Sequence, residues 1–475
     1  MATIPEVQSY PVKDWRNQII NEVKKNARIS ALFGAEGGNL YAVISHDIEG
    51  RLSIATTSID GSDKTYPSLS AELPQAEPFE REIAEQLGIT PKGHPRLKPI
   101  RRTKNMRDFY QVRGHEVHEV AVGPVHAGII ESGHFRFQCH GELVFNLEVV
   151  LGYQHRGIER ALIGGPDPRT LHYMETAAGD TTIGHATAYC QNIESLHGIK
   201  IPERAEVIRS IALELERTAN HVGDLGALAN DIGYLPTASF CGRLRGDFLN
   251  LTAQICGSRM GRGLVIPGGV AFDLSREMAL SFQQKIATLL KSTKEATALL
   301  WVSPSVLSRF EHVGTISQKT AADLGLVGPA ARASGLKHDV RVNYPTAAYE
   351  KFTSVSHPGG DVFARAYVRW LEIQSSVKLL IDQLLVLPET PIQNKNPNNQ
   401  HLPPNRMAVS MVEGWRGEIC HVAMTDRDGR FSRYKIVDPS FHNWAGLEVA
   451  LKNQQISNFP LCNKSFNLSY CGHDL

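Results

Sequence analysis

The sequence predicts an α+β protein, with a small N-terminal α/β domain followed by a helical bundle with flanking β-hairpins. Up to about residue 115, short runs with a period of two alternate with charged helical segments. Long segments with three–four apolar spacing follow, and a period of two returns near the C-terminus. At 475 residues the chain exceeds what one hydrophobic core usually holds. We therefore expect two domains, residues 1–118 and 119–475.

Composition indicates a soluble chain without a strong electrostatic field. Hydrophobic residues make up 42% and charged residues 21%, and 50 basic against 49 acidic residues give a net charge of +1. This balance favours neither nucleic acid nor lipid as a partner. The N-terminus lacks the apolar core of a signal peptide, and the apolar runs are too short to span a bilayer. We expect no transmembrane helix and a membrane link only through partner proteins.

The N-terminal domain is expected to combine two helices with a pair of strands. Its segments are, in order, a helix over 14–32, strands at 40–44 and 52–56, and a charged helix over 80–87. Gly88 is the expected C-terminal cap of the second helix. The Arg- and Lys-rich segment 99–118 indicates a linker, which places the domain boundary near residue 118.

A β-hairpin is predicted between Gly123 and Glu159, because two alternating runs surround a His140-Gly141 turn. Four ionisable residues in this stretch are unusual for a plain hairpin: His126, Glu131, His134 and His155. They are candidates for chemistry. Solvated loop histidines on an ordinary sheet are the alternative.

Three helices are expected in the second domain: 181–196, a long one after Pro202, and 361–387. The last has a near-heptad apolar seam, which indicates packing in a bundle. The segment 325–345 is too broken for a helix and carries Arg332, Asp339 and Arg341. Such charges are costly inside a bundle unless they are paired or face a cavity. A structural ion-pair network is the alternative to a functional role.

The C-terminal part returns to β character. A hairpin is predicted around the Arg427–Gly429 turn, and the final residues are expected to be packed. None of the seven cysteines forms a C-x-x-C pair. A zinc or iron–sulfur site built by this chain alone is therefore not expected.

Several motifs resemble known respiratory subunits. FEREIAEQLGITPKGHP resembles the C-type (thirty-kilodalton) subunit of respiratory complex I. GPVHAGIIESGHFRF, GYQHRGIE and GPAARASGLKHDVRVNYP look like the D-type (forty-nine-kilodalton) subunit. They look equally like the large subunit of group 4, energy-converting nickel–iron hydrogenases, including hydrogenase-4 component G and formate hydrogenlyase, which carry the same fusion. The resemblance implies a hydrogenase large-subunit fold for residues 119–475.

The resemblance also implies where metal ligands would stand. Nickel–iron hydrogenases hold their metals with four thiolates from two C-x-x-C pairs, because soft sulfur suits these metals. Here Ala178 and Thr181 occupy the first pair, and Ser469 and Gly472 the second, with Cys471 one place off. We therefore expect this chain to hold no nickel–iron centre.

In complex I the quinone head group lies near a hairpin His and a Tyr beside the first lost cysteine. His134 matches that His, and Glu131 matches a proton-transfer Glu of the hydrogenases. Gly179 stands where the Tyr would be, next to Asp180, and Tyr173 and Tyr470 are candidate substitutes. Asp180 can donate a proton if burial raises its pKa. Otherwise it is a simple N-cap for the following helix.

His126, His134, His155 and His185 then have two interpretations. They line a pocket where a reduced carrier takes up protons, or they are hydrogen-bonded core histidines. Four charged residues would hold the walls of such a pocket together: Arg156, Arg332, Asp339 and Arg341.

The resemblance implies a redox subunit of a membrane-associated, NADH dehydrogenase-like or hydrogenase-like complex. It would form a quinone- or substrate-binding pocket beside a small B-type iron–sulfur subunit. With membrane subunits as further partners, it would sit on the cytoplasmic side of the inner membrane. NADH use by the complex stays open. One alternative is a scaffold without catalysis that couples a dehydrogenase to an ion-pumping membrane arm. Another is a hydrogenase with unusual ligands.

Overall fold

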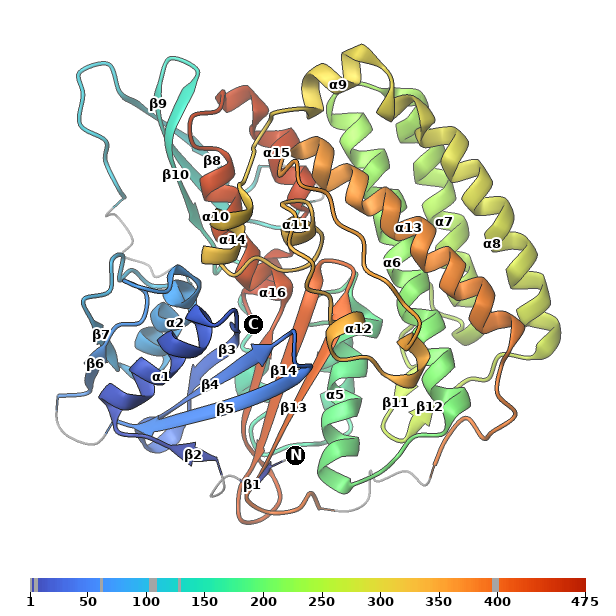
Figure 1. Ribbon diagram of the computed structural model, residues 1–475, viewed down its shortest axis with the longest axis horizontal. Helices are drawn as coiled ribbons and strands as arrows, with labels where there is room; N and C mark the ends of the chain where they lie inside the picture. The colour runs from blue at the N-terminus through green and yellow to red at the C-terminus, as the bar shows by residue number, and fades with distance from the viewer. Residues whose placement is uncertain (1, 4–6, 60–62, 102–108, 127–129, 395–400) are drawn as a thin grey trace.

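The computed structural model describes residues 2–3, 7–59, 63–101, 109–126, 130–394 and 401–475. It confirms the predicted α+β class. An N-terminal α/β unit, a central sheet, a helical bundle and a separate three-stranded sheet make up the fold (Figure 1). Within these residues no helix is long and apolar enough to cross a bilayer.

The N-terminal unit is a four-stranded sheet of order β2-β5-β4-β3 with two helices. Its elements are β2 (Gln8–Ser9), α1 (Val12–Lys24), β3 (Arg28–Gly34), β4 (Asn39–His46), β5 (Arg51–Ser58), β6 (Thr65–Pro67), α2 (Glu77–Leu87) and β7 (Thr90–Lys92). The two predicted strands and the charged helix are confirmed. Gly88 ends α2 in the left-handed conformation, at φ 65°, as the predicted cap requires.

The predicted helix over 14–32 is wrong in its second half. Helix α1 ends at Lys24, and the chain reverses at Asn26, which has a φ of 70°. Strand β3 then begins at Arg28, and Ile29 is buried in the sheet. The apolar spacing continued across the turn because both elements bury side chains in one core.

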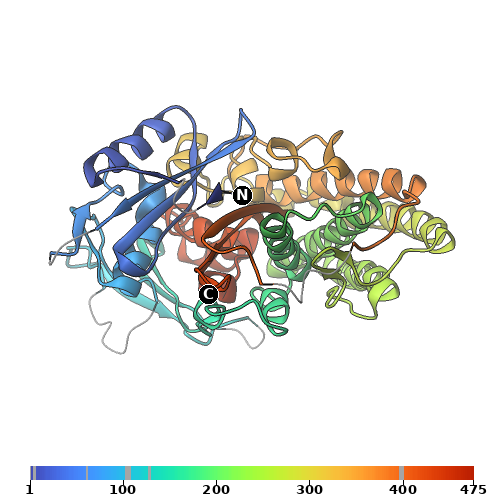
Figure 2. The same ribbon diagram turned by 90° about the horizontal axis from the view of Figure 1, so that it is seen from below.

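The central sheet has the order β1-β13-β14-β15. Its strands are β1 (Ala2–Thr3), β13 (Arg406–Gly414), β14 (Gly417–Thr425) and β15 (Phe431–Val437). The predicted hairpin over Arg427–Gly429 is confirmed as β14–β15. Met407, Val422 and Val437 pack into the core of the N-terminal unit. Figure 2 shows this sheet between that unit and the bundle. The domain boundary near residue 118 stays a prediction.

Four long helices form the bundle, with α6 packed on α7 and α13, and α8 on α7 and α13. They are α6 (Glu203–Asp231), α7 (Leu235–Cys256), α8 (Arg276–Thr297) and α13 (Val362–Leu385). The prediction of α6 and α13 is confirmed, whereas α7 and α8 were not predicted. Helix α5 (Thr182–His197), also predicted, packs on β13 and β14.

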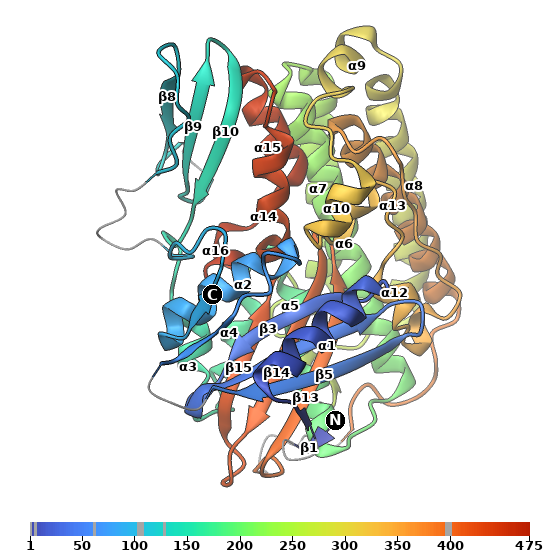
Figure 3. The same cartoon turned by 60° about the vertical axis from the view of Figure 1, so that its left-hand side comes forward.

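Three further strands form a sheet of order β10-β9-β8, beside α15 in Figure 3. They are β8 (His118–Val122), β9 (His134–His140) and β10 (Leu143–Val150). The predicted turn at His140-Gly141 is confirmed. His134 is the first residue of β9, so it lies at the end of the hairpin away from the turn. Residues 127–129 and 102–108, parts of the predicted hairpin segment and linker, lie outside the described residues.

Short helices fill the spaces between these layers. They are α3 (Ile158–Ala161), α4 (Thr170–Glu175), α9 (Pro304–Phe310), α10 (Gln318–Asp323), α11 (Gly328–Arg332), α12 (Val340–Asn343), α14 (Pro439–Ala450), α15 (Phe459–Phe466) and α16 (Tyr470–His473), with the small β11 (Val265–Ile266) and β12 (Gly269–Val270) pair. The segment 325–345 is thus partly helical. The C-terminus is packed as predicted, since Leu475 is buried.

Candidate functional site

The turn before α5 holds the first pair of positions where the resemblance places metal ligands. Ala178 and Thr181 are fully buried there, and Asp180 is half-buried. The Nη1 and Nη2 atoms of Arg416 donate to the two Asp180 carboxylate oxygens at 2.6 and 2.8 Å. Trp415 Nε1 donates to the Asp180 carbonyl at 2.9 Å. Residues of the β13–β14 turn therefore fix this loop by both its side chain and its backbone.

The pKa of Asp180 is lowered, which corrects the expectation of a neutral acid. Burial raises the pKa, but the charge and hydrogen bonds of Arg416 outweigh it. The alternative of a simple N-cap is also wrong. Thr181 is the N-cap residue of α5, and its own side chain makes no capping hydrogen bond. At neutral pH Asp180 is thus an ionised partner of Arg416.

The second pair of positions lies at α16. Ser469 is the N-cap, and its Oγ accepts from the Gly472 N–H at 2.9 Å. The Cys471 N–H donates to Glu131 Oε2 at 3.0 Å, which ties the loop before β9 to α16. Burial, together with the nearby Glu131 charge, raises the pKa of Cys471 to about 11. Cys471 is therefore a neutral thiol at physiological pH.

The turn before α5 and the segment that leads into α16 are joined by residues that contact both. Arg416 Nη1 also donates to Thr181 Oγ1 at 3.3 Å, and its Nε donates to the Asn467 carbonyl at 2.6 Å. The Asp438 carboxylate lies against Gly472, where a Cβ atom would be 2.6 Å from its Cγ. The turn before α5 and the segment 467–472 thus face one another around Arg416 and Asp438.

A nickel–iron centre does not fit these residues. The four positions carry no thiolate, and a side chain at Gly472 would collide with the Asp438 carboxylate. Soft sulfur donors are what nickel and iron need in such a centre. Within the described ranges no group of three or more His, Cys, Asp or Glu side chains could hold a metal ion.

His185, on α5, belongs to a fully buried chain of polar groups. Its Nε2 lies 3.1 Å from Asp438 Oδ2, and its Nδ1 lies 3.0 Å from His421 Nε2. His421 Nδ1 lies 3.1 Å from the Tyr434 hydroxyl. Burial, with His185 nearby, keeps the pKa of His421 well below its ordinary value. The His185 side chain therefore orients Asp438 beside the site and lies within the core.

Two histidines of the hairpin segment, His126 and His134, contact α16 and the start of that segment. His126 Nε2 is 3.2 Å from the Tyr470 hydroxyl, and Gly133 packs directly on the Tyr470 ring. His134 Nδ1 is 3.4 Å from the Gly123 carbonyl, and its ring packs on Phe109. Of the two candidate tyrosines, Tyr470 is thus the one in contact with this segment.

His155 and Arg156 are exposed and contact backbone. His155 Nδ1 lies 3.0 Å from the Asp474 carbonyl. The Arg156 guanidinium donates to the Thr176 and Ala177 carbonyls at 2.8 and 2.9 Å. Arg156 therefore holds the start of the turn that carries Ala178 and Asp180.

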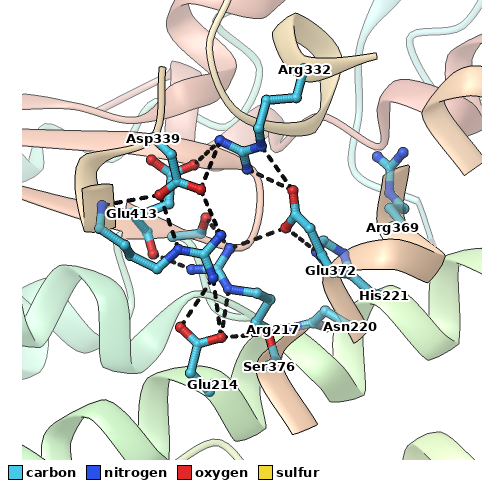
Figure 4. Close-up of polar contacts among 12 residues, drawn as sticks. Glu214, Arg217, Asn220, His221, Arg332, Asp339, Arg369, Glu372, Ser376 and Glu413 are labelled. Carbon is cyan, nitrogen blue, oxygen red and sulfur yellow. Dashed lines mark hydrogen bonds and ion pairs between the residues drawn. The ribbon is translucent and has the colours of Figure 1, made fainter. Parts of the chain in front are cut away.

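Arg332, Asp339 and Arg341 lie in a separate, fully buried ion-pair network (Figure 4). Arg332 binds Glu372 at 2.7 Å and Glu413 at 2.8 Å. Arg341 binds Asp339 at 2.8 Å and Glu214 at 3.2 Å. These ion pairs agree with the alternative interpretation, a structural ion-pair network.

This network supports the turn that presents Arg416. Arg217 on α6 donates to the carbonyls of Glu413 and Gly414, at the end of β13. His221, also on α6, bonds Glu372 at 2.9 Å and packs edge-on against Trp415. Charges on the four helices α6, α11, α12 and α13, together with Glu413 on β13, therefore fix the position of the β13–β14 turn. That turn in turn fixes Arg416 at the site.

Arg341 and Glu413 also line a cavity of about 370 Å³ between α5, α6, α12 and β13. None of the other predicted site residues lines it. The cavity is therefore separate from the site at Asp180, with which it shares no lining residue.

Arg416, Asp438 and His421 were not predicted from the sequence as site residues. Arg416 stands in a Gly-Trp-Arg-Gly turn and Asp438 precedes a Pro at a helix start, so each looks like ordinary turn or cap chemistry. Asp438 does cap α14, by accepting from the Ser440 N–H. Their place beside Asp180 and Gly472 depends on strand pairing in the central sheet.

The fold is that of a class of large subunits from respiratory and hydrogenase-related complexes, as the similarity to known proteins shows. Residues 231–411 match the family described as respiratory-chain NADH dehydrogenase, 49 Kd subunit. Residues 24–115 match the family described as its 30 Kd subunit. NADH-quinone oxidoreductase subunit 4 of Thermus thermophilus is 31% identical over 72% of this chain and 90% of its own length.

The chain therefore belongs to the 49 Kd subunit family, with a 30 Kd-type domain fused before it. Formate hydrogenlyase subunit 5 of Escherichia coli is 27% identical over 94% of this chain and 84% of its own length. A chain of the membrane-bound sulfane sulfur reductase, described as an archaeal respiratory membrane complex, has the same fold. It superposes with a TM-score of 0.71 at 23% identity, covering 76% of this chain and 99% of that one.

Proposed function

We propose that the chain is the redox subunit of a membrane-associated oxidoreductase complex and reduces a quinone or a similar carrier. The carrier would bind between the start of β9, the turn before α5 and α16. Electrons would come from an iron–sulfur cluster in a small B-type partner subunit. Membrane subunits would hold the assembly on the cytoplasmic side of the inner membrane.

One observation carries this proposal. The four positions where the resemblance places metal ligands hold Ala178, Thr181, Ser469 and Gly472, none of which is a cysteine. The ionisable groups around them nevertheless remain in place: Glu131 at Cys471, Asp180 with Arg416, and Asp438 with His185. A carrier that takes up protons with its electrons uses such groups without a metal.

Two electrons and two protons convert a quinone to a quinol, so the residues must deliver protons. Glu131 accepts from the Cys471 N–H, His134 is the first residue of β9, and Arg416 fixes a negative charge at Asp180. We assign His134 the role of proton donor to a carrier oxygen. A donor must lie within roughly 2.6–3.2 Å of that oxygen, or act through one water.

The assembled complex can be tested directly. We would reduce it with dithionite, add a water-soluble quinone, and follow reoxidation of the partner's cluster by electron paramagnetic resonance. Reoxidation that is slowed by His134→Ala supports the proposal. A cluster that stays reduced in the presence of quinone would favour the second candidate, a scaffold that couples a dehydrogenase to an ion-pumping arm.

A further inference from the structure

Glu216 is a buried carboxyl group outside the residues assigned to the proposed site. It lies on α6 and is 8% exposed. Among the described residues no Lys, Arg or His side chain lies within ion-pair distance of it, unlike Glu214 on the same helix, which pairs with Arg217 and Arg341. A buried carboxyl group without a cationic partner is rare, because ionising it in a low-dielectric core is costly.

The partners of Glu216 are main-chain N–H groups at the start of α5. Its Oε2 accepts from Ile183 at 2.8 Å and its Oε1 accepts from Gly184 at 3.3 Å. These N–H groups have no acceptor within their own helix, and the helix dipole favours negative charge there. The carboxyl group can therefore lose a proton and remain solvated by the protein.

Glu216 lies beside the turn that carries Asp180 and Thr181. A Cβ atom at Gly184 would lie 3.7 Å from Glu216 Oε1 and 3.1 Å from the Thr181 methyl carbon. One helical turn further along α6, Asn220 Nδ2 donates to the Asp180 carbonyl at 3.0 Å. Glu216 and Asp180 are thus two carboxyl groups on opposite sides of one short loop.

Their environments push them to different protonation states. Burial raises the pKa of Glu216 to about 8, partly opposed by the two N–H donors. The charge of Asp180 adds to the rise, and Arg217 on α6 lowers it. Asp180 is held ionised by Arg416. When the pKa values of two neighbouring carboxyl groups differ in this way, one group acts as a proton donor and the other stays ionised.

We propose that Glu216 is the proton store of the site and supplies one of the two protons that the reduced carrier needs, while Asp180 stays a fixed charge. This inference rests on the proposed function. Two electrons would come from the partner's iron–sulfur cluster. His134 supplies one proton, and Glu216 supplies the other by passing from carboxylic acid to carboxylate. Solvent then reprotonates both groups. The turn 180–184 separates Glu216 from the carrier, so Glu216 does not contact it. Glu216 is therefore a positioning residue that holds a proton.

The protonation state can be measured on the full chain by infrared spectroscopy with ¹³C-labelled glutamate. A protonated-carboxyl band that disappears as the pH rises through about 8 is expected. Glu216→Gln should abolish it, whereas the matched control Glu206→Gln, on the same helix, should leave it. Absence of any such band at neutral pH would overturn the inference. If Glu216→Gln does not fold, Glu216→Asp keeps the test, because an aspartate does not carry the glutamate label and the labelled band should be lost in this variant too.

The second arm uses the assembled complex. Reoxidation of the cluster by quinone should slow in the parent protein as the pH rises through about 8. Glu216→Gln should be slower by about 10²–10⁴-fold and lose this pH dependence. An unchanged pH profile in the variant would refute the proton-store role. If the parent complex reacts with no quinone, the proposed function fails, and the infrared titration alone then decides whether Glu216 stores a proton.

Discussion

The carboxylate of Asp180 and the guanidinium of Arg416 form a two-bond ion pair between the turn before α5 and the turn between β13 and β14. Segments more than 200 residues apart thus meet at one contact. It joins the turn that carries Ala178 and Thr181 to the central sheet. Because the same guanidinium reaches Asn467, the pair also connects to the segment before α16.

Arg416→Gln should raise the pKa of Asp180, because burial would then act without the opposing charge. The depressed native pKa means that the ion pair stabilises the fold above pH 3.8, the ordinary value for Asp. This contribution is lost as the pH falls through the lower native value. The variant should therefore be destabilised at neutral pH and differ less from the parent in acid. Urea unfolding at both pH values measures this, with the exposed Arg427→Gln as control. An equal loss at both pH values would contradict the prediction.

His134→Ala should lower quinone-dependent turnover of the assembled complex by about 10²–10⁴-fold, the usual range for a general acid–base group. Assembly should survive, since the side chain is only half-buried. The matched control is His140→Ala, at the other end of the same strand, where the side chain is exposed. Equal activity in the two variants would count against a role for His134.

Arg332→Met should destabilise the protein by about 3–5 kcal/mol, because it leaves the buried Glu372 and Glu413 carboxylates without this cation. The double variant Arg332→Met/Glu372→Leu should recover part of that loss. Arg243→Ala, in an exposed pair with Asp247, should change stability by less than about 0.5 kcal/mol. Chemical unfolding of the three variants tests the network. A loss in Arg332→Met no greater than in Arg243→Ala would show that it contributes little.

Glu216→Gln should change how stability depends on pH. The native pKa of about 8 lies above the ordinary 4.5, so the folded state binds more protons than the unfolded state between these values. Stability of the parent should therefore fall as the pH rises from 4.5 to about 8, by up to roughly 1.4 kcal/mol per pH unit. The variant should show a smaller fall. Parallel curves for parent and variant, from thermal unfolding at several pH values, would be inconsistent with a raised pKa.

The purified complex should contain no stoichiometric nickel, because the four ligand positions carry no thiolate. The chain expressed alone should show no visible cofactor absorbance, since the cluster is assigned to a partner. Elemental analysis and an absorption spectrum check both points. Nickel at about one per chain, or hydrogen-dependent dye reduction, would instead indicate a hydrogenase with unusual ligands.

Local elements and family membership follow from the order of residues along the chain. Periods of two and of three to four specified β9–β10, β14–β15, α6 and α13, because alternation and helical spacing follow directly from backbone geometry. The motifs around His134 and Arg332, taken together along the chain, were specific enough to indicate the family. The prediction that no nickel–iron centre is held also came from the sequence, because the resemblance places the metal ligands at Ala178, Thr181, Ser469 and Gly472.

The charge states of the site, in contrast, depend on how distant segments pack. Asp180 looked like a proton donor or a cap, but its pKa depends on Arg416, 236 residues away along the chain. Glu216 looked like one of many helix glutamates, yet its burial against the start of α5 raises its pKa. A pKa depends on desolvation and on neighbouring charges in space. Both are set by packing between distant segments, which spacing along one sequence does not contain.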